Sequence, residues 1–123
     1  MTIPWPGPSD PIREVSYALF VGFDDGGNPV YGHGSVRDAE TLQEVQGVLE
    51  PLQPSPATIT SVTMGEVDLH LQSGARVTLR PVFRPSAERY EGLLKVGNEE
   101  ILMPDPLAAL LNRWRDGLVR RRT

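Results

Sequence analysis

The chain has 123 residues, no cysteine, and 12 basic against 16 acidic side chains, which gives a net charge of −4. Without cysteine it can form neither disulfide bonds nor thiolate metal sites, and its length suits one domain with a core of its own. We find no stretch as long as a transmembrane helix and no signal-peptide pattern, so we expect a soluble, cytoplasmic protein.

The first residues are rich in proline, a composition typical of extended, polyproline-like backbone. We therefore predict an N-terminal arm over residues 1–13, with Trp5 as the side chain best suited to anchor it. A single α+β domain is expected over residues 14–118, followed by a basic C-terminal tail over residues 119–123.

The first predicted strand runs from Glu14 to Phe23, where the odd positions are large and apolar and two even positions are apolar as well. Such a strand is buried on much of both faces and is expected near the centre of a sheet. Residues 24–29 combine Asp, Gly, Asn and Pro and predict a turn, so residues 30–35 should complete a hairpin. Asp38 then caps a predicted helix that ends near Glu50, before a proline.

A second hairpin is predicted from the alternation of apolar and polar residues between Val67 and Arg80. A two-residue turn would set apolar residues of one strand beside polar residues of the other. A three-residue loop ending at Gly74 instead pairs Leu69 with Val77 and keeps the apolar side chains on one face. Upstream, we interpret Gly65 as a bulge or bend in a longer strand that starts near Thr58.

A third hairpin and a last helix follow. Residues 89–96 and 99–103 are predicted to pair about a two-residue turn, with Leu94 opposite Ile101. Asp105 is the predicted N-cap of an amphipathic helix. The order of elements indicates an α+β fold, with an antiparallel sheet of about five to six strands and two amphipathic helices packed on one face.

Asp24 and Asp25 offer oxygen ligands for a divalent cation in a glycine-rich loop. Their spacing does not match an EF-hand, and the same residues suit a tight turn for backbone reasons. We therefore predict no metal and no cofactor. These aspartates remain candidate ligand-binding residues together with Tyr31 and His33, in a pocket between sheet and helix.

The two histidines, His33 and His70, lie on different predicted strands, and nothing in the sequence places them near each other. Glycines on both sides of His33 would allow a ligand to approach the backbone, although flexibility at a strand end explains them equally well. His70 is expected as a polar-face neighbour of Arg76.

Five arginines lie within residues 113–123. Candidate contacts to nucleic-acid phosphates are Arg113, Arg120, Arg121 and Arg122. Basic residues near the end of a helix also complement its dipole, and the rest of the chain is acidic, so nucleic acid is not the partner that we expect.

No catalytic residues are predicted, because the chain has no G-x-S-x-G elbow, no H-E-x-x-H motif and no nucleotide-binding fingerprint. Our first hypothesis is a non-enzymatic interaction module that uses a face or an edge of its sheet to bind a protein partner or a second copy of itself. Apolar residues on both faces of the strand from Val15 to Phe23 and of the hairpin from Leu93 to Leu102 support it. The alternatives are a small-molecule or metal-binding domain or small enzyme near Tyr31 and His33, and nucleic-acid contact through the C-terminal arginines.

Overall fold

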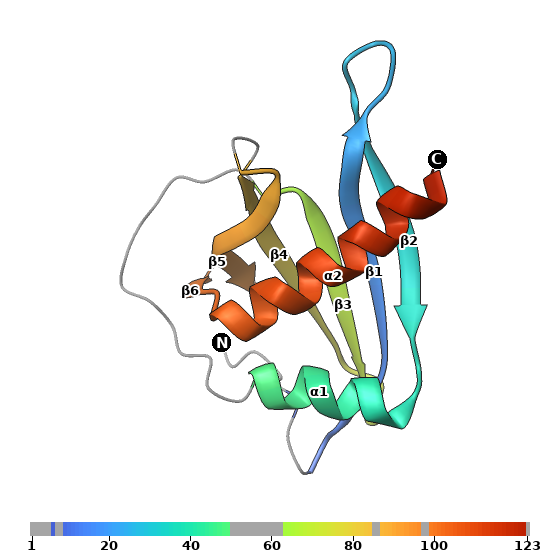
Figure 1. Ribbon diagram of the computed structural model, residues 1–123. Coiled ribbons are helices and arrows are strands. Elements are labelled where there is room, and N and C mark those ends of the chain that lie inside the picture. Colours follow the sequence, from blue (N-terminus) through green and yellow to red (C-terminus); the bar gives the residue numbers. More distant parts are fainter. Residues whose placement is uncertain (1–5, 7–8, 50–62, 85–86, 97–98, 123) are drawn as a thin grey trace.

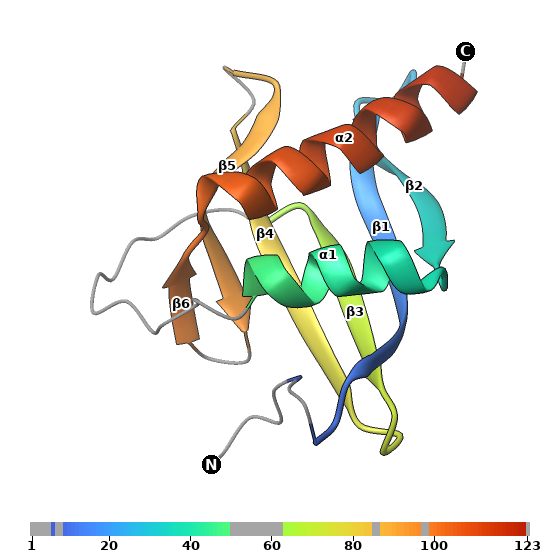
Figure 2. The ribbon, with the colours of Figure 1, turned by 60° about the horizontal axis from the view of Figure 1, so that its bottom comes forward.

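The computed structural model describes residue 6 and residues 9–49, 63–84, 87–96 and 99–122. Its six strands form one antiparallel sheet in the order β2-β1-β3-β4-β5-β6, and two helices lie on the same face of it (Figures 1 and 2). This confirms the predicted α+β fold. The elements are β1 (Ile12–Phe23), β2 (Pro29–Val36), α1 (Ala39–Leu49), β3 (Gly65–Leu71), β4 (Arg76–Arg84), β5 (Arg89–Val96), β6 (Glu99–Leu102) and α2 (Asp105–Arg122).

The β3–β4 hairpin has the register that the alternation predicts. Leu69 pairs with Val77, and His70 pairs with Arg76. The connecting loop has three residues, and Gly74 takes the left-handed conformation that such a loop needs, with φ of 95°. The β5–β6 pairing also matches the prediction, while its turn at residues 97–98 lies outside the described residues.

β3 begins at Gly65, and the predicted upstream continuation from Thr58 to Val62 lies outside the described residues. Gly65 has φ of 101°, and a Cβ atom built there would lie 2.4 Å from the carbonyl oxygen of Ala18 on β1. The backbones of β1 and β3 therefore approach each other closely at a point that only glycine permits.

Both helices pack an apolar stripe against the sheet. The carboxylate of Asp38 accepts bonds from the amide and hydroxyl of Thr41, which cap α1 and lower the pKa of Asp38. α2 begins one residue earlier than predicted, because the carbonyl of Pro104 accepts the first helical bond from Ala108. It continues to Arg122, so residues 119–122, expected as a tail, are helical.

Tyr17 and Trp114 join β1 to α2. Their rings are parallel within 7° and their centroids are 4.7 Å apart. Trp114 is therefore a packing residue on the helix face of the sheet. Within the part of the chain that the structure describes, we find no helix with the length and apolarity needed to span a bilayer.

The described part of the N-terminal arm is bound to the domain. The carboxylate of Asp10 accepts bonds from the amide and hydroxyl of Ser73, at 2.9 and 2.7 Å. The carbonyl of Pro6 accepts a bond from the side chain of Gln46 on α1. Trp5, the predicted anchor, lies outside the described residues.

Candidate functional site

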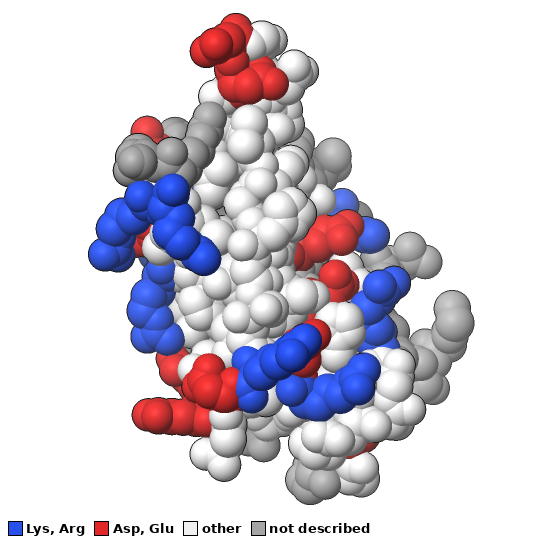
Figure 3. All heavy atoms as spheres, turned by 90° about the vertical axis from the view of Figure 1, so that its right-hand side faces the viewer, with Lys and Arg blue, Asp and Glu red and all other residues white. Residues whose placement is uncertain are grey.

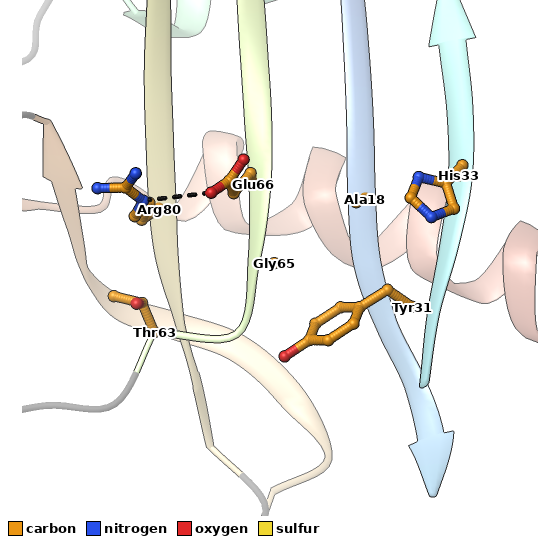
Figure 4. A pocket seen from close by; sticks show the side chains of 7 residues that line it. All are labelled: Ala18, Tyr31, His33, Thr63, Gly65, Glu66 and Arg80. Carbon is orange, nitrogen blue, oxygen red and sulfur yellow. Dashed lines mark hydrogen bonds and ion pairs between the residues drawn. The ribbon is translucent and has the colours of Figure 1, made fainter. Parts of the chain in front are cut away.

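Two of the predicted site residues, Tyr31 and His33, line a hollow of about 410 Å³ (Figure 4). The two residues alternate along β2 with Gly32 and Gly34, which face Leu118 and Tyr17 on the helix side. Because successive residues of a strand point to opposite faces, Tyr31 and His33 lie on the open face of the sheet. The predicted position between sheet and helix is therefore wrong. The hollow is lined by Ala18, Tyr31, His33, Thr63, Gly65, Glu66 and Arg80.

The polar groups of this hollow come from three strands. His33 stands on one side of it, and Glu66 and Arg80 form an ion pair of 3.4 Å on the other. Each partner of that pair is half exposed, so the attraction is weakened by water. An imidazole, a phenol, a carboxylate and a guanidinium around one hollow can hold a small polar ligand, although the two charged groups already satisfy each other.

Asp24 and Asp25 do not line the hollow, since their loop extends beyond the ends of β1 and β2 (Figure 1). One carboxylate oxygen of Asp24 accepts bonds of 2.9 Å from the amides of both Gly26 and Asn28. This is the backbone role of an aspartate in a turn. In the described segments, no three Asp, Glu or His side chains come together in a group that could hold a metal ion.

His33 and His70 do not meet. His33 pairs with Ala18 on one side of β1, and His70 pairs with Glu14 on the other side. The two histidines are thus separated by four residues along β1 as well as by its width. His70 instead lies 2.9 Å from the hydroxyl of Ser16.

The arginines of α2 have separate roles. Arg113 forms a 2.8 Å ion pair with Glu44 of α1, and the side chain of Arg120 donates to a backbone carbonyl one turn earlier. Arg121 is exposed, and the side chain of Arg122 lies outside the described residues. Arg113 therefore helps to join the two helices in addition to being a candidate phosphate contact.

Arg115 belongs to an aromatic cluster that the sequence does not reveal. Its guanidinium lies 4.7 Å from the ring centroid of Phe83 and donates a 2.7 Å bond to the carbonyl of Phe20. Tyr90 packs edge-on against Phe83. Beside the cluster is a second hollow of about 330 Å³, with Phe23 at 58% exposure on its lining. Since these residues come from four distant segments, no spacing in the sequence marks them.

One side of β2 has no neighbouring strand among the described residues, because β2 is the first strand in the order of the sheet. Phe20 of β1 donates its amide to the hydroxyl of Tyr90, on the side of β1 away from β2. Because this amide points away from β2, Phe20 and its partner Tyr31 form a non-hydrogen-bonded pair. Hydrogen-bonded and non-hydrogen-bonded pairs alternate along an antiparallel ladder. The amides and carbonyls of Tyr31, His33 and Ser35 therefore point outward, away from the sheet.

Comparisons with known proteins add no relative from which a role can be transferred. No protein family matches the chain, and neither a curated protein nor a solved structure is significantly similar to it.

Proposed function

We propose that this protein is a non-enzymatic interaction module whose β2 edge receives an extended strand of another polypeptide. The observation that carries the proposal is the composition of this edge: after its first residue, Pro29, β2 holds no charged residue and no further proline. Figure 3 views the edge and shows an uncharged stripe between charged side chains. Soluble proteins usually protect a sheet edge with charges, proline, a bulge or a covering segment.

An added strand would find regularly spaced partners on β2. Tyr31, His33 and Ser35 each offer one amide and one carbonyl, and each main-chain bond contributes about 1 kcal/mol. The opposite edge is a poorer template, because β6 has only four residues and two of them are glutamates. The structure of the sheet therefore favours β2 over β6.

The β2 edge is also a better candidate for the binding surface than a face of the sheet. The apolar side chains that first suggested an interaction face are largely covered within the chain itself, since Phe20 and Leu93 are buried. Among the described large apolar residues, those that are exposed are Phe23 on β1 and Leu102 on β6, with three strands between them. Two separate side chains do not make an apolar patch.

A photo-crosslinking amino acid at Ser35 tests this proposal in the native host cells. We expect a covalent adduct with a polypeptide, and we expect His33→Pro to abolish it while His33→Ala leaves it. The amide of His33 points outward, so proline removes a donor for the added strand without removing a bond to β1.

The same photo-crosslinker at Gln43, which is exposed on α1, is the control for random collisions. Equal adducts from both positions, or an adduct at Ser35 that survives His33→Pro, would show that β2 does not receive a strand.

A further inference from the structure

We propose that the strand received by β2 is β2 of a second copy, paired antiparallel about a two-fold axis at His33. This inference rests on the proposed function and names the partner of the same edge. The two six-stranded sheets would join into one continuous sheet, with the helices of both copies on the same face.

The sequence of the edge is nearly its own reverse. Residues 30–36 are Val-Tyr-Gly-His-Gly-Ser-Val, symmetric about His33 except at one pair of positions. In the proposed register each Gly32 faces Gly34 of the second copy. The one asymmetric pair sets a large Tyr31 beside a small Ser35, so side chains on the open face do not collide.

Part of this symmetry already serves the fold of one copy. A Cβ atom at Gly34 would lie 2.5 Å from the ring of Tyr17, and one at Gly32 would lie 3.1 Å from Leu118. The glycines alone therefore do not indicate a partner. In this register Tyr31 lies opposite Ser35 of the second copy and His33 lies opposite its counterpart, so every outward amide and carbonyl of the three residues finds a partner.

Charge supports the antiparallel direction. Arg37 follows β2 at one end, where it forms an ion pair with Glu14 of its own chain and keeps 79% of its side chain exposed, and the Asp24–Asp25 loop precedes β2 at the other end. Figure 3 shows acidic side chains gathered at that loop. Antiparallel pairing places Arg37 of one copy near the acidic loop of the other, whereas parallel pairing would place like charges together.

α2 lies close to the proposed axis. Leu118 lies over Gly32, and the helix continues past β2 in both views (Figures 1 and 2). The α2 helices of the two copies would therefore lie near each other on the same face of the joined sheet.

A single cysteine tests the axis, because the natural chain has none. In His33→Cys the two thiols would belong to directly opposed residues, with Cα atoms about 5.5 Å apart, which a disulfide can bridge. In Ser35→Cys the thiol lies on the same face of the same strand, but the two thiols would be four residues apart along the paired strands, about 13 Å. Under mild oxidation we expect a covalent dimer from His33→Cys and at least tenfold less from Ser35→Cys.

Sedimentation equilibrium provides the second measurement. We expect a dimer for the unmodified chain and for His33→Ala, and a monomer for His33→Pro. Equal crosslinking by the two cysteine variants, or a monomer at millimolar concentration, would overturn the second-copy proposal. If the photo-crosslinker at Ser35 still captured a different polypeptide in a β2-dependent manner, the proposed function would stand and the identity of the partner would be wrong.

Discussion

Replacing Gly65 with alanine is expected to lower the free energy of unfolding by about 3 kcal/mol. The residue has φ of 101°, where a side chain costs about 1–2 kcal/mol. Its new Cβ atom would also lie 2.4 Å from the carbonyl oxygen of Ala18. That oxygen belongs to the backbone of the internal strand β1, so relieving the overlap requires β1 and β3 to separate, at a further cost of about 1–3 kcal/mol.

Gly74→Ala is the matched control for this prediction. Gly74 has nearly the same backbone conformation, with φ of 95°, but a Cβ atom added there would meet no neighbouring atom within 4 Å. Only the conformational cost of about 1–2 kcal/mol applies. Urea denaturation followed by tryptophan fluorescence measures both variants. Equal losses would mean that the close approach of β1 and β3 at Gly65 does not constrain the fold.

Tyr90→Phe is expected to cost about 2–4 kcal/mol at neutral pH. The hydroxyl of Tyr90 accepts a 2.8 Å bond from the amide of Phe20 and donates a 2.5 Å bond to the carbonyl of Met64. Phenylalanine fills the same space but leaves a buried amide and a carbonyl unpaired, at about 1–3 kcal/mol each. A loss below about 0.5 kcal/mol, the value for a surface change, would contradict this role.

The same hydroxyl predicts a loss of stability in alkaline solution. Burial raises the pKa of Tyr90 to about 12 from its ordinary value of 10.0. Between these values the unfolded chain releases the proton while the folded chain keeps it, so unfolding becomes easier as pH rises. The full difference of about two pKa units corresponds to about 2.7 kcal/mol, present below pH 10 and lost by about pH 12.

Denaturation at several pH values between about 9 and 12 would isolate this contribution. We expect the free energy of unfolding to fall less steeply with pH in Tyr90→Phe than in the unmodified chain. Tyr31→Phe, which changes a tyrosine on the open face, should keep the steep fall. Identical slopes for the unmodified chain and Tyr90→Phe would show that Tyr90 is not the group responsible.

The registers of the hairpins could be predicted from sequence because a strand has a strict period of two. Pairing Leu69 with Val77 is the choice that keeps apolar residues on one face, and the structure has this pairing. Helix boundaries are less strictly determined. A proline carbonyl can accept the first bond of a helix as well as an aspartate can, so the predicted start of α2 was wrong by one residue.

The candidate site was predicted less well, because sequence proximity does not imply spatial proximity. Asp24 and Asp25 are close in sequence to Tyr31, yet their loop carries them away from the hollow. Glu66 and Arg80, which do line it, come from β3 and β4. The outer edge of β2 is exposed because β3 pairs with β1 on the side away from β2. The alternation of residues within a strand does not show which strands are neighbours, so this exposure could not be predicted from the sequence.

Amide hydrogen exchange along β2 is the most direct test of strand addition at this edge. In an isolated copy, the amides of Gly32 and Gly34 bond to β1, whereas those of Tyr31, His33 and Ser35 point outward. We predict that protection of the outward set rises with protein concentration until it approaches that of the two glycines, and that His33→Pro removes the rise. Outward amides that exchange freely at every concentration would contradict pairing of β2 with a second copy.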